Sequence, residues 1–90
     1  MNNAEKIIIP SSVFAQLVDD EMVLLDTESE NYFGLDAIGT VMWQQLVENP
    51  WLDVLKSYML EQYEVEEERL EKDIKIFVKR LVEHQLITLG

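Results

Sequence analysis

VLLDTESENYFGLDAIGTVMW, residues 23–43, is the stretch that decides the fold, because strand, turn, strand and helix start follow one another in it. Residues 23–25 are aliphatic, residues 27–31 are polar and turn-prone, and residues 32–35 bring back the aromatic and aliphatic side chains that favour strands. Asp36 then offers a carboxylate for a helix N-cap. A short hairpin that leads into a capped helix leaves a strand edge with free N–H and C=O groups, and an extended peptide can pair with such an edge. We therefore expect the functional surface at this edge.

The amino-terminal third of the chain predicts a small antiparallel sheet. Residues 13–18 are strand-like, and Asp19 with Asp20 supplies turn residues before a second strand over residues 22–26. Together with residues 32–35, these segments predict a three-stranded meander.

The chain is expected to divide into a flexible amino-terminal arm over residues 1–12 and a folded domain over residues 13–90. The arm contains three isoleucines at residues 7–9. They either add a strand or pack under the sheet before Pro10 ends the pairing.

Three helices are predicted after the sheet, which makes the whole pattern that of an α+β domain. The first spans about residues 37–48, the second begins with Asn49 as N-cap and Pro50 at its first position, and the third spans about residues 66–84. Apolar residues at helical spacing define the expected buried stripes: Ile38, Val41, Met42 and Leu46 beside Trp43 in the first helix, Leu52, Leu55, Met59 and Tyr63 in the second, and Leu70, Ile74, Phe77, Val78 and Leu81 in the third.

One apolar residue of the third helix falls outside its buried stripe. At about 100° per residue, Ile76 projects with Asp73 and Arg80 on an adjoining face of the helix. An exposed apolar side chain between an acid and a base suggests the wall of a groove, although a solvated helix face explains most of the charges on this helix.

Length and composition limit the functional classes. Ninety residues make one domain with one small core, and no apolar run approaches the roughly 20 residues that span a bilayer. Without a signal-peptide pattern the chain is expected in the cytoplasm, and without cysteine it has no disulfide, thiolate zinc site or cysteine nucleophile. The net charge of -11, from 18 acids and 7 bases, disfavours a nucleic-acid partner because that affinity depends on Lys and Arg.

Residues suited to catalysis or metal binding form no recognisable site. The single histidine, His84, lies near the end of the third helix, where it complements the helix dipole or packs. The serines lack a nucleophile elbow, the glycines form no phosphate loop, and the acidic run over residues 64–68 has no calcium-loop spacing. We therefore expect a protein that is not an enzyme and that uses no metal or cofactor.

The order of these features resembles the PqqD-type family of leader-peptide recognition domains, which serve ribosomal peptide biosynthesis. The resemblance covers about residues 13–89 and is carried by NYFGLDAIGTVMWQQL at residues 31–46 and DIKIFVKRLVEHQLI at residues 73–87. It is strongest toward the small stand-alone recognition proteins of lasso-peptide pathways. One departure is Asp36, where the family often has asparagine, and both residue types cap helices.

The resemblance implies a winged helix-turn-helix-like domain that binds the leader of a precursor peptide as an added strand, between the third strand and the third helix. The leader-binding residues that it implies are Asn31, Tyr32, Phe33, Gly34 and Leu35 on the strand, and Asp73, Ile76, Phe77 and Arg80 on the helix. Neighbouring strand residues point to opposite faces, and Phe33 shares the side of Leu35, which is expected in the core. Tyr32 is therefore predicted to face the groove.

The partners that the resemblance implies are the precursor leader, a cysteine-protease-like leader peptidase and a lasso cyclase. The domain itself would do no chemistry and would raise the local concentration of the precursor at these enzymes. Because a free strand edge also permits weak self-association, a monomer or a weak dimer is expected.

Two alternatives stay open at the level of sequence. Three helices with a small sheet are also the architecture of winged-helix transcription regulators, although the second helix carries only Lys56 as a base against Asp53 and Glu61. The same recognition domain also serves quinone-cofactor and radical-enzyme peptide pathways, which differ in the leader that binds.

Overall fold

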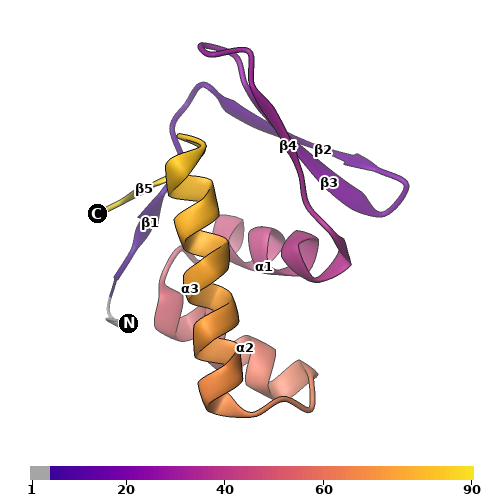
Figure 1. Ribbon diagram of the computed structural model, residues 1–90, viewed down its shortest axis with the longest axis vertical. Coiled ribbons are helices and arrows are strands. Elements are labelled where there is room, and N and C mark those ends of the chain that lie inside the picture. Colours follow the sequence, from indigo (N-terminus) through magenta and orange to yellow (C-terminus); the bar gives the residue numbers. More distant parts are fainter. Residues whose placement is uncertain (1–4) are drawn as a thin grey trace.

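The predicted strands and helices form in the expected order. The computed structural model describes residues 5–90, and the prediction of an α+β domain with three helices and a three-stranded antiparallel sheet is confirmed (Figure 1). A second sheet pairs strands from the two ends of the chain. The elements are β1 (Ile7–Ile8), β2 (Val13–Val18), β3 (Glu21–Asp26), β4 (Tyr32–Gly34), α1 (Ala37–Glu48), α2 (Leu52–Gln62), α3 (Glu67–Glu83) and β5 (Thr88–Leu89).

The three-stranded sheet is a meander with two free edges. Its order is β2-β3-β4, so that β2 and β4 each pair with a strand on one side only. Asp19 and Asp20 connect β2 to β3 with φ angles of 49° and 69°, a left-handed conformation that aspartate tolerates better than most residues do. The turn chemistry in the sequence therefore sets the first hairpin.

Asp36 caps α1 as predicted, and the predicted buried stripe of this helix is confirmed at Met42 and Leu46 but not at Ile38. The Asp36 carboxylate accepts a hydrogen bond from the N–H of Gly39 at 2.7 Å. Ile38, predicted in the buried stripe, is 44% exposed, whereas Thr40 is buried and its hydroxyl accepts the Met22 N–H at 2.9 Å. That hydrogen bond fixes the rotation of α1 against β3 and turns Ile38 away from the core.

The predicted start of α2 at Asn49 and Pro50 is wrong by two residues. Asn49 instead ends α1, donating its N–H to the carbonyl of Gln45, and Trp51 is the residue before α2. The physical reason is a backbone pairing that competes with helix formation, since the carbonyl of Pro50 accepts the N–H of Ile7 at 2.9 Å. At the other end of the helix, Tyr63 is the C-cap and is 38% exposed, so it is not the core residue predicted.

The prediction of a flexible arm over residues 1–12 does not hold for residues 5–12, whereas residues 1–4 lie outside the described part of the chain. Ile7 is 1% exposed and belongs to the core. β1 pairs with β5 in antiparallel register, with Ile7 opposite Leu89, and the N–H of Gly90 donates to the carbonyl of Lys6 at 2.8 Å. The isoleucines therefore both add a strand and pack in the core, which are the two roles expected for them, and their strand partner β5 lies at the other end of the chain.

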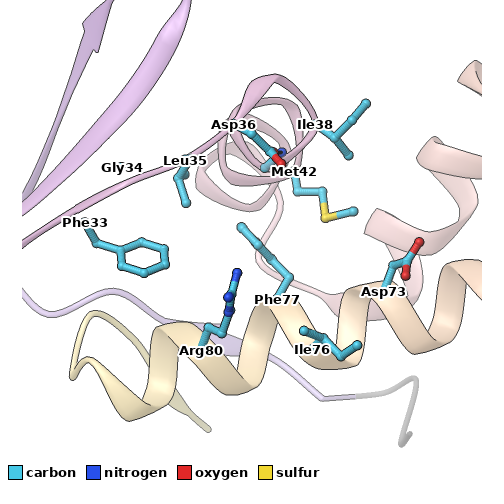
Figure 2. Close-up of a pocket in the computed structure, with 11 residues that line it drawn as sticks. Phe33, Gly34, Leu35, Asp36, Ile38, Met42, Asp73, Ile76, Phe77 and Arg80 are labelled. Carbon is cyan, nitrogen blue, oxygen red and sulfur yellow. Dashed lines mark hydrogen bonds between the residues drawn. The ribbon is translucent and has the colours of Figure 1, made fainter.

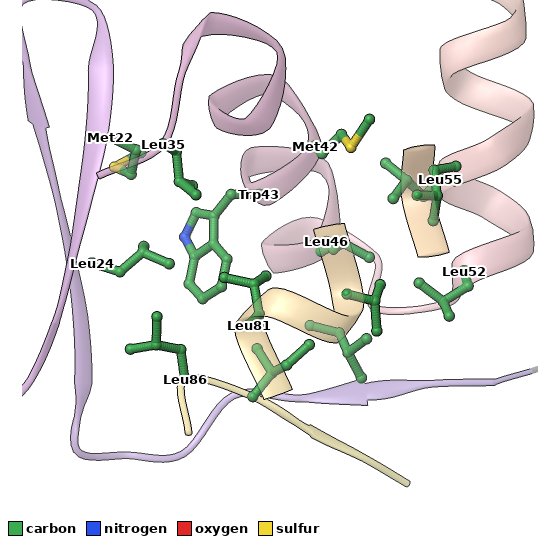
Figure 3. Packing of buried hydrophobic residues seen from close by; sticks show 14 of the residues in the cluster. Met22, Leu24, Leu35, Met42, Trp43, Leu46, Leu52, Leu55, Leu81 and Leu86 are labelled. Atoms are coloured by element: carbon green, nitrogen blue, oxygen red, sulfur yellow. The ribbon is translucent and has the colours of Figure 1, made fainter. Parts of the chain in front are cut away.

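The core lies between the sheet and the three helices and is centred on one tryptophan (Figure 3). Trp43, 2% exposed, lies among Leu24, Leu35, Leu81 and other labelled apolar side chains. The stripe predicted for α3 is confirmed at Leu70, Ile74, Val78 and Leu81, whereas Phe77 is only partly buried. None of the helices over residues 5–90 is long and apolar enough to cross a membrane.

Lys56, a partly buried residue, joins α2 to α3. The Lys56 ammonium lies 3.2 Å from Glu71 and 3.4 Å from Glu67. Burial of the ammonium lowers its pKa, but the hydrogen bond to Glu71 and the charges of both carboxylates outweigh this effect and raise the pKa of Lys56 overall. The Lys56 ammonium therefore stabilises the contact between α2 and α3, where both of its carboxylate neighbours lie.

Candidate peptide-binding groove

A groove of about 450 Å³ opens between β4, the first turns of α1 and one face of α3 (Figure 2). Its walls come from two stretches that are distant in the sequence, residues 33–42 and residues 73–80, and both backbone and side chains line it. The lining residues are Phe33, Gly34, Leu35, Asp36, Ile38, Gly39, Met42, Asp73, Ile76, Phe77 and Arg80.

Most of the candidate residues from the sequence meet in this groove. Phe33, Gly34 and Leu35 line one wall, and the opposite wall has Asp73, Ile76, Phe77 and Arg80. The prediction that Ile76 projects beside Asp73 and Arg80 outside the buried stripe is confirmed, since Ile76 is 50% exposed.

Asn31 and Tyr32 are the two candidate residues whose side chains do not line the groove. Asn31 is exposed and uses its carbonyl to accept the N–H of Asp26 at 2.9 Å, which holds the turn between β3 and β4. Tyr32 is 75% exposed and lies over the outer face of the sheet, beside Phe14 and Leu25.

The prediction that Tyr32, and not Phe33, faces the groove is therefore wrong. Phe33 and Leu35 do share one side of the strand, as predicted, but that side contains both the core and the groove. The helices cover only part of this face, so that Leu35 is 5% exposed whereas Phe33 is half-buried and reaches the opening. The alternation of side chains correctly predicted that Phe33 and Leu35 lie on one face of β4. The packing of the helices decided that part of this same face stays open as the groove.

The free edge of β4 presents backbone groups at two alternate residues. The N–H of Leu35 donates to the carbonyl of Met22 at 2.8 Å, and the strands pair with Gly34 opposite Val23 and Tyr32 opposite Leu25. Because hydrogen-bonding residues alternate along an antiparallel strand, the backbone groups of Tyr32 and Gly34 point away from β3. The edge therefore has N–H donors and C=O acceptors for one more strand, and a Cβ built on Gly34 would meet no atom within 4 Å.

Gly39 lets the wall from α3 approach α1 closely. A Cβ at this position would lie 3.3 Å from the Phe77 ring and 3.2 Å from the Asp36 carboxylate. The missing side chain thus makes room for Phe77 at the floor of the groove.

Several residues near the groove were not predicted from the sequence. Asp36, Ile38, Gly39 and Met42 contribute a wall from α1, and His84 packs on Phe33 with ring centroids 4.6 Å apart. His84 also donates from Nδ1 to the carbonyl of Arg80 at 2.8 Å, so it both packs on Phe33 and bonds a carbonyl at the end of α3, in keeping with the two roles predicted for it. The available signal was Gly39, since a glycine in the first turn of a helix indicates a close approach.

The groove has a mixed lining of apolar, backbone and charged groups. Over residues 5–90 no group of three His, Cys, Asp or Glu side chains is placed to hold a metal ion. The charged lining residues are Arg80, Asp73 and Asp36, of which Asp36 is engaged in capping α1. The fold and the groove together define a small α+β domain with an open-edged sheet beside a helix.

Comparison with known proteins gives the family. The model of the family described as "Coenzyme PQQ synthesis protein D (PqqD)" matches residues 21–87, and this chain belongs to that family. The match includes β3, β4 and all three helices.

Two solved structures are similar to this chain over nearly its whole length. One is TbiB1 in complex with the TbiA(beta) leader peptide, with 31% identity, a TM-score of 0.84, and coverage of 89% of this chain and 93% of that one. The other is a lasso peptide synthetase B1 complexed with the leader peptide, with 25% identity, a TM-score of 0.83, and coverage of 92% of this chain and 98% of that one. Comparison with curated protein sequences gives no match.

Proposed function

We propose that this protein is a recognition domain for the leader of a ribosomally made precursor of the lasso-peptide type. It binds the leader as an added strand on the free edge of β4, with leader side chains in the groove in front of α3. It then delivers the precursor to a leader peptidase of the cysteine-protease type and to a lasso cyclase. The protein does no chemistry of its own and needs no cofactor.

The free edge of β4 beside an open groove is the observation that carries this proposal. Tyr32 and Gly34 offer backbone groups for pairing, and the half-exposed side chains of Phe33 and Ile76 offer apolar contact on either side. In peptide recognition by strand addition, main-chain hydrogen bonds supply affinity and pockets for alternate side chains supply specificity. Both parts of that arrangement are present along one edge.

The comparisons support a leader as the ligand. The chain is a member of the PqqD family, and the two similar solved structures are described as complexes with leader peptides. The description of one of them names a lasso peptide synthetase, which favours that pathway over quinone-cofactor or radical-enzyme pathways for this chain.

Presentation of the precursor is the contribution that a non-catalytic domain makes. By holding the leader, the protein converts a bimolecular encounter between enzyme and precursor into a local one with a high effective concentration. We expect the complex to be a monomer with its leader, while the free protein is a monomer or a weak dimer through an open strand edge.

Titration of a labelled leader tests the proposal. The probe is the fluorescein-labelled leader segment of a precursor peptide encoded beside the gene of this chain, with a scrambled peptide and a short DNA duplex as controls. Saturable binding of the leader alone is the expected result. Binding to the duplex alone would favour a winged-helix transcription regulator, and absence of leader binding would overturn the proposal.

Ile76 provides the mutational test of the groove. Ile76→Glu places a charge on the apolar wall and is expected to weaken leader binding about tenfold or more, since burying an unpaired charge against a ligand is costly. The matched control is Val82→Glu, because Val82 is also an exposed aliphatic residue of α3 but lines a different cavity. Native circular dichroism with unchanged leader affinity in Ile76→Glu would place the site elsewhere.

A further inference from the structure

The groove has opposite charges at its two ends (Figure 2). Arg80, the only base among the described residues that line it, lies near the end where Phe33 projects from β4. Asp73 lies toward the other end, on the side of Ile38. Neither side chain takes part in an ion pair within residues 5–90, where both ion pairs belong to Lys56.

The separation of these charges matches the repeat of an extended peptide. Arg80 follows Asp73 by seven residues, which is about 10.5 Å along the axis of a helix that rises 1.5 Å per residue. An extended chain advances about 3.3 Å per residue and its side chains alternate between two faces, so that two side chains four residues apart share one face and reach both ends. Between the two charges α3 presents Ile76 and Phe77, which give the middle of the groove an apolar wall.

Backbone pairing alone leaves the register of an added strand undefined. Every residue of a peptide offers similar N–H and C=O groups, and strands without a specific side-chain pattern slip along their partners. A pair of opposite charges at fixed separation removes this freedom, because a shift of two residues along the edge separates both charges from their partners.

We propose that this groove selects its leader by charge register, an inference that rests on the leader-binding function proposed above. The ligand has an acidic side chain over Arg80, a basic side chain over Asp73 four residues away on the same face of the strand, and an apolar side chain between them on that face. The chain has a net charge of -11, so an acidic leader residue is repelled by most of the surface and is stabilised in the groove at Arg80.

Charge reversal at the two ends tests the inference. The probe is the same labelled leader of the neighbouring precursor, titrated at about 0.05 M and about 0.5 M salt, because salt screens exposed charges. Arg80→Glu and Asp73→Lys are each expected to raise Kd about five- to tenfold at low salt and by less at high salt. A leader whose acid at the Arg80 end is replaced by lysine is expected to bind Arg80→Glu more tightly than it binds the unmodified protein.

Two substitutions on another face of α3 are matched controls. Lys79→Glu and Glu83→Lys change the net charge by the same amounts as the two groove variants, and both residues line a different cavity. They are expected to change Kd by no more than about twofold at low salt. Arg80→Gln and Asp73→Asn remove each charge without reversing it and are expected to show smaller losses in the same direction.

The possible outcomes separate this inference from the proposed function. Lack of leader binding to the unmodified protein would overturn both. If the four groove variants and the controls all bound the leader as tightly as the unmodified protein does, the charge register alone would be overturned. The register would also be overturned if the leader that binds contained no acid and base four residues apart.

Discussion

At the scale of single residues, the turn that connects β3 to β4 is stabilised by one buried carboxylate, that of Asp26. Asp26 is 5% exposed and accepts hydrogen bonds from the Ser29 hydroxyl at 2.8 Å and from the Glu28 N–H at 3.1 Å. The Ser29 hydroxyl and the Glu28 N–H stabilise the charged form, so the pKa of Asp26 lies below its ordinary value. Asp26 thus supports the candidate site from outside it.

We expect Asp26→Asn to be less stable than the unmodified protein at pH 7, with a difference that shrinks in acid. A carboxyl group whose pKa is lowered by folding stabilises the fold at pH values above its unfolded pKa of ~3.9, and the stabilisation is lost as the pH falls through the folded pKa. Urea unfolding at a series of pH values between 7 and 2 measures the difference. Asp19→Asn, in the exposed turn between β2 and β3, controls for the loss of one negative charge. A difference that stays constant down to pH 2 would contradict the assignment.

At the scale of elements, the two edges of β4 have different roles. One edge pairs with β3, and the other presents the backbone groups of Tyr32 and Gly34 next to the groove. The Tyr32 side chain lies on the outer face of the sheet, so its backbone and its ring belong to different surfaces. Backbone and side-chain substitutions at this residue should therefore have different effects.

We expect Tyr32→Pro to weaken leader binding, whereas Tyr32→Ala leaves it nearly unchanged. Proline lacks the N–H that the added strand would accept, and an edge strand tolerates proline where its N–H faces outward. Loss of one hydrogen bond corresponds to about 0.5–1.5 kcal/mol, or about a two- to tenfold rise in Kd. Fluorescence anisotropy with the labelled leader measures the effect, and thermal melting confirms that both variants fold. Equal affinities in two folded variants would argue against pairing on this edge.

At the scale of the whole molecule, the two chain ends are part of the framework that holds the groove. β1 and β5 pair on the side of α3 away from β4 (Figure 1), and the N–H of Leu52 donates to the carbonyl of Glu5 at 3.0 Å. The amino-terminal segment therefore connects the carboxyl end of the chain to the start of α2 and places Ile7 in the core.

Two neighbouring isoleucines test this role. Ile7 is 1% exposed and Ile8 is 48% exposed, so Ile7→Ala leaves a cavity in the core and Ile8→Ala does not. We expect Ile7→Ala to lower the free energy of unfolding by about 2–4 kcal/mol and Ile8→Ala by about 1 kcal/mol or less. Chemical denaturation measures both values. Equally small decreases in the free energy of unfolding for both variants would show that the segment contributes little to stability. That is the result expected of the flexible arm predicted from the sequence.

The sequence alone predicted what local chemistry controls. Alternating and helical spacing of apolar residues gave the strands of the meander and the three helices, and Asp36 was correctly predicted as a cap. The position of Ile76 outside the buried stripe of α3 was also sufficient to place it on the groove wall with its charged neighbours. Each of these features depends on residues that are close together in the sequence, so the spacing of residue types is sufficient to predict it.

The errors arose where distant segments compete for the same groups. The start of α2 was misplaced because the backbone of Pro50 pairs with Ile7. Ile38 was wrongly predicted in the core because Thr40 binds the Met22 N–H and takes the buried position in the first turns of α1. Neither partner is visible in a local window of sequence. In each case a hydrogen bond to a residue distant in the sequence outweighed the local helix preference.

The sequence by itself determined the elements, the acidic charge and the two sides of each strand and helix. Only the tertiary structure decided that the open part of the sheet lies on the same side as the core, which puts Phe33 in the groove and Tyr32 on the outer face. The physical reason is that alternation fixes which side chains share a face, whereas the extent to which α1 and α3 cover that face depends on how the whole core packs.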